Sequence, residues 1–237
     1  MYKALLAYDG TCYFGWQKTP SGPSIQEELE KAIARITGES VLPESASRTD
    51  RGVHAEGQVI RFTLKNSANP HRLMRGLNAV LPGDIRVREL APCQFHPALD
   101  AMGKTYRYRI CLGPVQDPVN RLYSWHIYFP LNVAKMERAA RSLIGTHDFT
   151  AFANEEGKDP LCTIQSIDIV EDCIWIKGNR FLYKMVRNIV GTLVHIGCGK
   201  LPEDCIPDIL ASRDRKKAGI TAPAQGLHLH QVFYAVK

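Results

Sequence analysis

The sequence predicts an α+β fold in which short strands and amphipathic helices follow one another along two halves of the chain. Three observations support this prediction: apolar runs of strand length, helical apolar spacing behind capping residues, and turn residues between these segments. The 237 residues can form one large domain or two closely packed halves. Hydrophobic residues at 45% and charged residues at 23% match soluble globular proteins and exclude disordered and fibrous classes.

The first half opens with an apolar run at residues 2–8, which predicts a buried strand ended by the turn-forming pair Asp9-Gly10. A helix follows, because Ser24 and Glu27 have the spacing of a capping box and helical apolar spacing continues to about Thr37. Gly38 then ends this helix. The other elements predicted in this half are a strand at 58–64, a helix at 72–80 and a strand at 85–90.

The second half begins after Phe95-His96-Pro97 with residues 104–111, whose alternating, aromatic sequence is typical of a strand. Alternation places Tyr106 and Tyr108 on one face of that strand. A long helix is expected to begin near Arg180. The remaining elements predicted are a strand at 123–128, a helix at 133–144, strands within 163–177 and a final strand at 227–236.

Charge and cysteine content indicate the kind of partner and the compartment. The 30 Lys and Arg residues against 24 Asp and Glu residues give a formal charge of +6, which favours nucleic acid as the partner class. The seven cysteines form no C-x-x-C pair and fit reduced thiols better than a disulfide framework, so we expect a cytoplasmic protein. The apolar start of the chain is too short for a signal peptide, and no run reaches the length of a membrane span.

Residues 47–54 place the Asp50 carboxylate between the guanidiniums of Arg48 and Arg51. The common interpretation of such a segment is a solvated turn, because aspartate favours turns and surface ion pairs contribute little. However, the apolar residues Val53 and Val59 lie close by and indicate the margin of a core, where ionisable groups usually have a function. Asp50 is therefore the first candidate catalytic residue.

Two further features have both a structural and a functional interpretation. Tyr106 either packs in the sheet or stacks on an unpaired base, since aromatic side chains commonly hold such bases. Arg180, Lys184 and Arg187 share one stripe of the expected helix, which is either a solvated basic face or a set of cations for phosphates or carboxylates. Arg187 lies deepest in the apolar stretch and is the preferred candidate.

Metal and nucleotide cofactors lack support in the sequence. His228 and His230 alternate along the last strand, but no third ligand follows at a recognisable spacing. The chain contains no Walker A loop, no G-x-G-x-x-G after a strand and no G-x-S-x-G elbow. We therefore expect neither a metal nor a nucleotide cofactor.

Several segments, in order along nearly the whole chain, resemble the TruA-type tRNA pseudouridine synthases. In the first half they are Tyr8-Asp9-Gly10 with Tyr13 and Gly15-Trp16-Gln17, Arg48-Thr49-Asp50 with Gly52-Val53-His54-Ala55, Gly57-Gln58-Val59, Asn78 with Leu81-Pro82 and Asp84-Ile85, and Phe95-His96. In the second half they are Lys104, Tyr106 and Tyr108, His147-Asp148-Phe149-Thr150 with Phe152, Met185-Val186-Arg187-Asn188-Ile189-Val190-Gly191, and Gly226-Leu227 with Leu229.

The resemblance implies the pseudouridine synthase fold, with two α/β halves whose antiparallel sheets join across a central basic catalytic cleft. It implies an N-terminal half, 1–100, that carries the catalytic aspartate loop, and a C-terminal half, 101–237, that carries the base-contacting tyrosine and the basic helix. It also implies a homodimer that isomerises uridines 38, 39 and 40 of the tRNA anticodon stem-loop without a cofactor. Asp50 then corresponds to the nucleophile, Tyr106 to the residue that contacts the base, and Arg48 and Arg187 to the surrounding arginines.

Three residues depart from the family's pattern, and these departures bear on how the protein binds RNA. Arg51 stands where a small residue is common, Ser47 where glycine is common, and Ala98 where an arginine is frequent.

Two other classes of protein remain open from the residues alone. A non-catalytic RNA-binding module needs only the basic balance and the aromatic residues, whereas a glycoside hydrolase needs a second carboxylate that Asp50 lacks in its vicinity along the chain.

Overall fold

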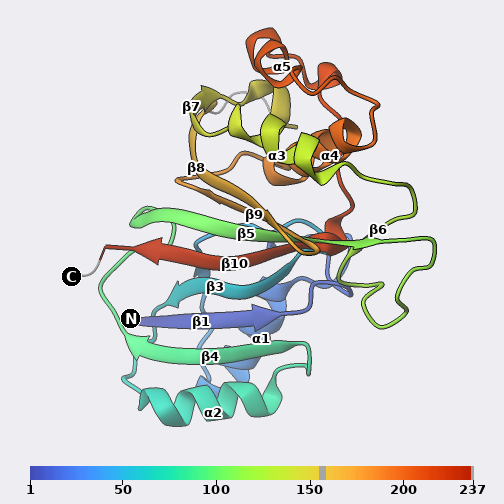
Figure 1. The fold of residues 1–237 in the computed structure, drawn as a ribbon. Coiled ribbons are helices and arrows are strands. Elements are labelled where there is room, and N and C mark those ends of the chain that lie inside the picture. The colour runs from blue at the N-terminus through green and yellow to red at the C-terminus, as the bar shows by residue number, and fades with distance from the viewer. Residues whose placement is uncertain (155–158, 236–237) are drawn as a thin grey trace. The chain divides into compact units, whose positions relative to one another are not determined.

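The computed structural model describes residues 1–154 and 159–235, which fall into two compact units. The first unit contains Met1–Met102 together with the end of the chain from His228, and the second contains Gly103–Leu227. Each unit combines a mostly antiparallel sheet with helices (Figure 1), so the predicted α+β class is confirmed. The predicted second half, 101–237, differs from the second unit at its end, because the last strand pairs within the first unit and contacts group residues 228–235 there.

The sheet of the first unit has the strand order β4-β1-β3-β10, and the short strand β2 pairs with β3. Strand β1 runs antiparallel to both β3 and β4, whereas β10 runs parallel to β3. Tyr2, Ala4, Leu6 and Tyr8 alternate as the buried residues of β1. The strand bounds are β1 (Tyr2–Tyr8), β2 (Glu44–Ser45), β3 (His54–Phe62), β4 (Ile85–Pro92) and β10 (Leu227–Tyr234).

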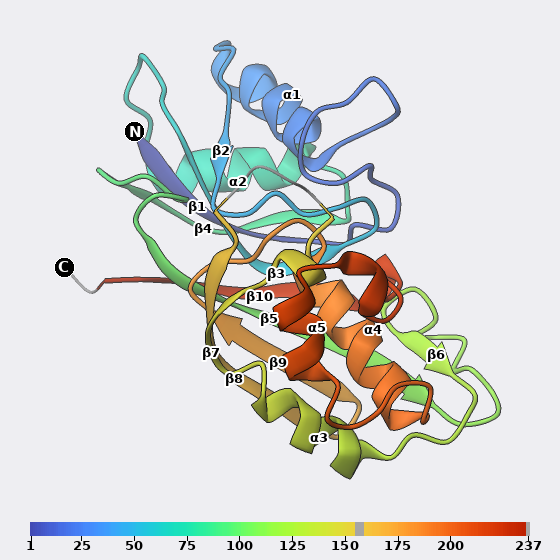
Figure 2. The same cartoon turned by 90° about the horizontal axis from the view of Figure 1, so that it is seen from above.

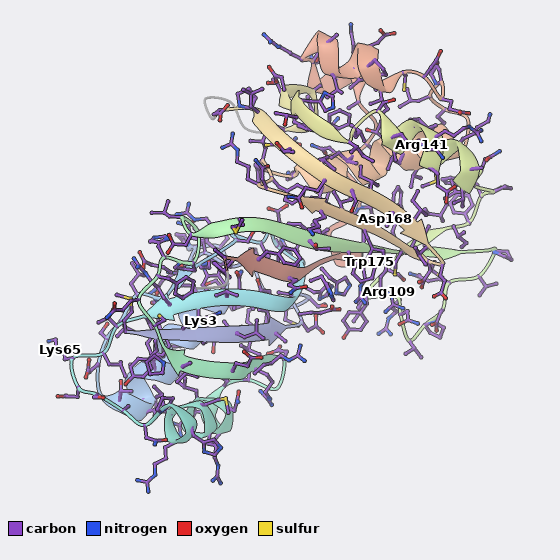
Figure 3. The ribbon with its side chains drawn as sticks, turned by 60° about the vertical axis from the view of Figure 1, so that its left-hand side comes forward. Lys3, Lys65, Arg109, Arg141, Asp168 and Trp175 are labelled. Atoms are coloured by element: carbon purple, nitrogen blue, oxygen red, sulfur yellow. The ribbon has the colours of Figure 1, made fainter. Side chains whose placement is uncertain are left out.

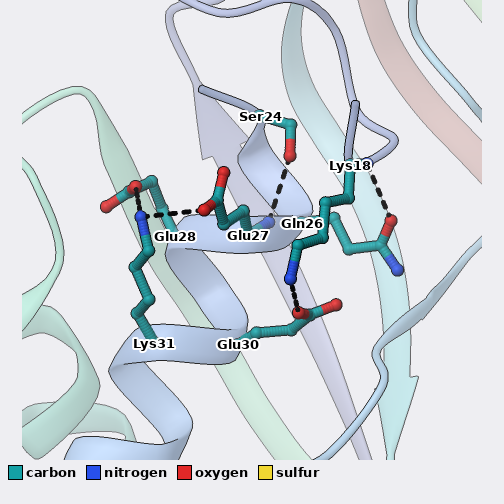
Figure 4. Close-up of polar contacts among 7 residues, drawn as sticks. All are labelled: Lys18, Ser24, Gln26, Glu27, Glu28, Glu30 and Lys31. Atoms are coloured by element: carbon teal, nitrogen blue, oxygen red, sulfur yellow. Dashed lines mark hydrogen bonds and ion pairs between the residues drawn. The ribbon is translucent and has the colours of Figure 1, made fainter. Parts of the chain in front are cut away.

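Helices α1 (Ile25–Thr37) and α2 (Pro70–Val80) lie side by side against one face of this sheet (Figure 2). Helix α1 begins as predicted, because the Ser24 hydroxyl accepts a hydrogen bond from the Glu27 N–H at 3.2 Å. It ends at Gly38, whose φ of 73° suits glycine. On its solvent side Lys31 forms ion pairs with Glu27 and Glu28 (Figure 4).

The sheet of the second unit has the order β5-β9-β8-β7, and β6 pairs with β5 in parallel. Helices α3, α4 and α5 lie on one side of strands β8 and β9 (Figure 1). The strand bounds are β5 (Ala101–Leu112), β6 (Trp125–Ile127), β7 (Gly145–Asp148), β8 (Leu161–Val170) and β9 (Cys173–Gly178). The helix bounds are α3 (Val133–Arg141), α4 (Met185–Gly197) and α5 (Ile206–Ser212), with 3₁₀ turns at Thr150–Phe152, Arg215–Lys217 and Ala224–Gly226.

The two faces of β5 differ as the alternation predicted. Tyr106 and Tyr108 are buried, whereas Arg107 and Arg109 are partly exposed on the opposite face. There the Arg107 guanidinium lies 5.6 Å from the centre of the Trp175 ring. Figure 3 shows Arg109 and Trp175 projecting from the side of the sheet away from the helices.

The helix expected from Arg180 begins only at Met185, so the prediction of a single basic stripe through Arg180, Lys184 and Arg187 is wrong. Lys184 precedes the helix with a φ of 61°, a left-handed conformation that interrupts helical geometry. Arg180 instead binds the Leu161 carbonyl and the Asp159 carboxylate. Of the three residues, only Arg187 therefore lies on the helix.

Other differences concern the ends of elements. Strand β3 begins at His54, four residues earlier than predicted, and α3 ends at Arg141, three residues before Ile144. The final strand ends at Tyr234, and Val236, which we expected to include, lies outside the described residues. Element ends depend on local capping and pairing, which periodicity does not report.

Candidate active site

The Asp50 loop, residues 47–54, connects β2 to β3 in the first unit. The chain turns directly after Asp50, because the Val53 N–H donates to the Asp50 carbonyl at 3.1 Å and Gly52 adopts a φ of 76°. The Asp50 side chain is partly exposed, whereas Arg48 and Arg51 are exposed. The loop therefore carries a partly exposed aspartate that is flanked along the chain by two exposed arginines.

The segment after β1 holds this loop from one side. The Trp16 N–H donates to the Thr49 carbonyl at 3.0 Å, and the Gly52 N–H donates to the Tyr13 carbonyl at 3.3 Å. Gly15, with a φ of 97°, lies so close that an added Cβ would come within 2.6 Å of the Thr49 carbonyl oxygen. The backbones of the two segments are therefore in direct contact on both sides of Asp50.

Buried polar side chains hold the start of the loop. The Tyr8 and Thr49 hydroxyls share a hydrogen bond of 2.8 Å. The fully buried Gln58 amide donates to the Ser47 carbonyl at 2.6 Å and accepts from the Ser47 N–H at 3.2 Å. Because unsatisfied groups at buried positions are costly, these bonds favour one conformation of the loop.

The end of the loop is anchored by His54, which is 2% exposed. Its Nδ1 accepts a hydrogen bond from the Gly10 N–H at 3.1 Å and lies 3.1 Å from the Asp9 carboxylate. Its ring stacks on that of His228, with 4.7 Å between the ring centres. Nothing in the sequence-based interpretation assigned His54 this anchoring position.

No group of three or more His, Cys, Asp or Glu residues that could hold a metal ion occurs in the described parts of the chain. His228 and His230 lie on β10 near Glu56, whose carboxylate is 2.7 Å from Nδ1 of His230. Within the same parts, no helix is both long enough and apolar enough to cross a bilayer.

In the second unit, Tyr106 lies on the buried face of β5 and is 7% exposed. Phe181 meets its ring edge-on, with 5.3 Å between the ring centres and an angle of 90°. The neighbouring Tyr108 is fully buried, and its hydroxyl donates to the Pro223 carbonyl at 2.8 Å. Burial raises the pKa of Tyr108, so this tyrosine remains protonated and has a structural role.

Arg187 lies in the first turn of α4, where its position is determined by backbone contacts. Its Nε donates to the Ala222 carbonyl at 2.7 Å, and the Ala222 N–H donates to the Arg187 carbonyl at 3.1 Å. The adjacent Asn188 is fully buried and binds the Phe152 carbonyl at 2.6 Å and the Thr221 hydroxyl at 2.6 Å. The start of α4 is therefore held in place by two other segments of the same unit.

Lys104 belongs to the same motif as Tyr106 and Tyr108, but the sequence alone predicts no role for it. It lies two residues before Tyr106 and shares the same strand face by alternation. Burial lowers the pKa of the Lys104 ammonium to about 8, so this cation is poorly hydrated. Its period-two spacing from Tyr106 is the signal that could have identified it.

The predicted site residues thus fall into two groups, each described within its own unit. Arg48 and Asp50 lie on one loop of the first unit, and Tyr106 and Arg187 lie on β5 and α4 of the second. Within the second unit, Arg187 acts electrostatically on Tyr108, the neighbour of Tyr106 on the buried face of β5.

Known proteins are similar to this chain over nearly its whole length. A family model described as tRNA pseudouridine synthase matches residues 4–96 and 139–235. The chain is 48% identical to tRNA pseudouridine synthase A 2 of Protochlamydia amoebophila (strain UWE25), an alignment that covers 98% of this chain and 93% of that protein. It is 46% identical to tRNA pseudouridine synthase A of Thermoanaerobacter sp. (strain X514), over 97% and 98% of the two chains. The protein named tRNA pseudouridine synthase A in Streptococcus equi subsp. equi (strain 4047) is 40% identical over 98% of each chain.

The fold and the matched residues define a pseudouridine synthase, an isomerase that acts on RNA. Within that class, the chain belongs to the tRNA pseudouridine synthase A family, whose members act on tRNA.

Proposed function

We propose that this enzyme converts uridine to pseudouridine at positions 38, 39 and 40 of the tRNA anticodon stem-loop, with Asp50 as the nucleophile. The observation that supports this proposal most directly is the presentation of Asp50 on a tightly held loop. Backbone contacts from Tyr13 and Trp16 and side-chain bonds from Gln58 restrict the loop, while the carboxylate stays partly exposed. A nucleophile contributes most to the reaction rate when the protein fixes its geometry before the substrate binds.

The isomerisation balances without any other reactant. The bond between N1 and C1′ breaks, the uracil turns, C5 bonds to C1′, and the proton on C5 is lost while N1 gains one. An Asp50 carboxylate can attack either C1′ or C6 to form a covalent intermediate. Its oxygen leaves C1′ when C5 bonds there, or leaves C6 when C5 loses its proton and the C5–C6 double bond is restored. Since atoms and electrons balance within the nucleotide, the reaction requires no redox partner.

We propose that Tyr106 contacts the target base and that Arg48 and Arg187 bind the substrate. A base must leave the helical stack before it can react, and an aromatic ring can hold it once flipped. Tyr106 is supported for this by its fixed edge contact with Phe181. Arg48 is supported by its exposure beside Asp50, and Arg187 by the backbone contacts that fix the start of α4.

We further propose that the enzyme is a cytoplasmic homodimer. All seven cysteines, each within the described residues, are free thiols, as a reducing compartment favours. Light scattering on the purified protein tests the proposed dimer, and a mass of about 27 kDa, equal to the 26.6 kDa chain, would contradict it.

The decisive experiment replaces Asp50 with asparagine, which preserves shape but removes the charge and the nucleophile. We expect Asp50→Asn to bind tRNA but to form no detectable pseudouridine, measured by chemical labelling of unmodified tRNA before and after incubation. The same labelling maps the modified positions in the wild-type reaction. Asp168→Asn, which changes an exposed carboxylate of the second unit (Figure 3), is the matched control and should retain activity.

A solvated turn would give the opposite result, because asparagine serves an Asx turn as well as aspartate does. Substantial pseudouridine formation by a folded Asp50→Asn protein would therefore contradict the assignment of the nucleophile. A melting curve on each variant separates loss of chemistry from loss of fold.

A further inference from the structure

We propose that Arg51, supported by the ring of Phe14, binds a backbone phosphate next to the target uridine. The inference rests on the proposed function, because it takes Asp50 to mark the position of the target nucleotide. Arg51 follows Asp50 directly and is exposed. The proposed contact therefore lies next to the proposed nucleophile.

The position of the Arg51 guanidinium is determined by one contact. Its central carbon lies 4.2 Å from the centre of the Phe14 ring, within the range of a cation–π interaction. Phe14 itself is held, because its N–H donates to the Pro23 carbonyl at 2.8 Å. Its ring also lies against Gly22, where an added Cβ would come within 2.4 Å of ring carbon Cε2.

The contact with the Phe14 ring leaves the hydrogen-bonding capacity of the Arg51 guanidinium unused. A guanidinium that packs on an aromatic ring keeps its N–H groups in its own plane, directed away from the ring. Within residues 1–154 and 159–235, Arg51 has no carboxylate, carbonyl or hydroxyl partner. It is also exposed, so these donors face solvent beside the Asp50 loop.

A phosphodiester is the ligand that fits these properties. Its oxygens can accept two parallel hydrogen bonds from one guanidinium, and a positioned arginine loses less entropy on binding than a free one. Lys31 of the same unit differs in this respect, because it is 60% exposed but forms ion pairs of 3.1 and 3.0 Å with Glu27 and Glu28 (Figure 4).

The first test measures the affinity of an anticodon stem-loop RNA across salt concentrations. Loss of one phosphate contact should reduce the slope of log affinity against log salt by about one in Arg51→Ala. Affinity at moderate salt should fall on the order of ten-fold, as for a lost charge-assisted hydrogen bond. Lys31→Ala removes the same charge elsewhere in the unit and should leave the slope unchanged.

Two conservative variants separate the effect of the Arg51 charge from the effect of the Phe14 ring that supports it. Arg51→Lys keeps the charge and should keep the slope, but it loses the planar pair of donors and hence part of the affinity. Phe14→Leu keeps an apolar side chain and should weaken binding about two- to five-fold without changing the slope, because only the cation–π support is lost. A purely structural role for Arg51 would alter the melting temperature and leave the slope as in wild type.

The second test locates the phosphate. Stem-loop RNAs that carry a neutral methylphosphonate linkage on one side or the other of the target uridine remove one charge at a known place. When the linkage that Arg51 contacts is made neutral, wild type should bind the RNA more weakly than it binds the unmodified RNA. Arg51→Ala should bind the two RNAs with almost equal affinity. Independent losses at every linkage near the uridine, or a wild-type salt slope in Arg51→Ala, would overturn the proposal.

These outcomes differ from those that concern the proposed function. If wild type forms pseudouridine and Arg51→Ala binds RNA exactly as wild type does, the phosphate contact is wrong and the proposed function stands. If wild type forms no pseudouridine while Arg51→Ala shows the reduced slope, the proposed function fails and the phosphate contact is retained.

Discussion

At the scale of the residue, Tyr106 and Tyr108 can be compared by the neighbours that their side chains contact. The two tyrosines share one face of β5, and the Tyr108 hydroxyl donates a hydrogen bond to the Pro223 carbonyl at 2.8 Å. Tyr106 is held by an edge contact of its ring with Phe181. Tyr108 therefore has a structural role in the interior of the unit, whereas contact of Tyr106 with the base remains our proposal.

We expect Tyr106→Phe to bind tRNA nearly as wild type does but to turn over about 10²- to 10⁴-fold more slowly, if the hydroxyl assists proton removal from C5. The ring and its contact with Phe181 are retained, which explains the unchanged binding. Single-turnover kinetics measure the effect. Tyr108→Phe is the control: it should lose about 1 kcal/mol of stability with the bond to Pro223 and keep its turnover. Equal turnover in Tyr106→Phe and wild type would reduce Tyr106 to a stacking surface.

The position of Lys104 predicts how the free energy of unfolding depends on pH. Its pKa is about 8 in the folded protein but near the ordinary 10.5 in the unfolded chain. The unfolded chain therefore binds more protons between these values, so this residue makes the free energy of unfolding rise as the pH increases from about 8 to 10.5. Below pH 8 the buried ammonium destabilises the fold to its full extent.

Lys104→Met should consequently be more stable than wild type at pH 7, and the difference should shrink as the pH approaches 10. Urea unfolding of both proteins at pH 7, 8, 9 and 10 measures this, and the other titrating groups cancel in the difference. A difference independent of pH would show that the Lys104 ammonium is not held in a poorly hydrated position.

At the scale of the element, the Asp50 loop is held by the segment that follows β1 more than by its own residues. The Gly15 backbone contacts Thr49 so closely that no side chain fits between them. Gly15 and Trp16 both lie in this supporting segment, and the Trp16 N–H donates to the Thr49 carbonyl.

Gly15→Ala and Gly38→Ala form a matched pair, because both glycines have positive φ values, 97° and 73°. Nothing lies within 4 Å of a Cβ at Gly38, whereas a Cβ at Gly15 meets the Thr49 carbonyl oxygen at 2.6 Å. Gly38→Ala should cost about 1 kcal/mol of stability and retain activity. Gly15→Ala should displace the Asp50 loop and lose most pseudouridine formation, as measured by labelling. Comparable activity in the two variants would contradict this role for Gly15.

The start of α4 shows how a hydrophobic pattern can mislead. The apolar spacing of residues 185–197 predicts a helix correctly, but the preceding basic residues appeared to continue it. Asn179 ends the regular pairing of β9, because its side chain accepts from the N–H groups of both Thr163 and Arg180. Such local bonds compete with helix formation and leave no trace in hydrophobic periodicity.

At the scale of the whole molecule, the chain divides into two units, and its end returns to the first. Strand β10 lies parallel to β3 and pairs His228 with His54 and Leu229 with Ala55. The pairing brings His228 onto the ring of His54, the residue that anchors the Asp50 loop. The last strand therefore contributes to the support of the candidate nucleophile from more than 170 residues away along the chain.

We expect Gly57→Ala to disturb this pairing, because an added Cβ would come within 2.3 Å of the His230 carbonyl oxygen. The expected loss of stability is about 1–3 kcal/mol, as for other overpacked positions, together with reduced activity. Gly83→Ala is the control, since the nearest atom to its Cβ is 3.9 Å away on the Arg86 side chain. Equal melting temperatures in the two variants would contradict the close approach of β10 to β3.

The sequence by itself determined the class of fold, most of the helices and strands, and the ordered motifs that identify the family. These features are local: they depend on the spacing of apolar residues, on caps such as Ser24 and on the order of short motifs. The same locality explains why Asp50 could be selected, since its loop is one contiguous segment of eight residues, 47–54.

Only the tertiary structure decided which residues support that loop and that the Tyr108 hydroxyl binds the Pro223 carbonyl. Gln58, His54 and Gly15 act through contacts with Ser47, Gly10 and Thr49, partners that sequence spacing does not reveal. The return of β10 to the first unit and the position of Arg51 on Phe14 depend likewise on how separate segments pack. The physical reason is that periodicity records which face of an element is buried, whereas hydrogen bonds and close approaches depend on what is packed against that face.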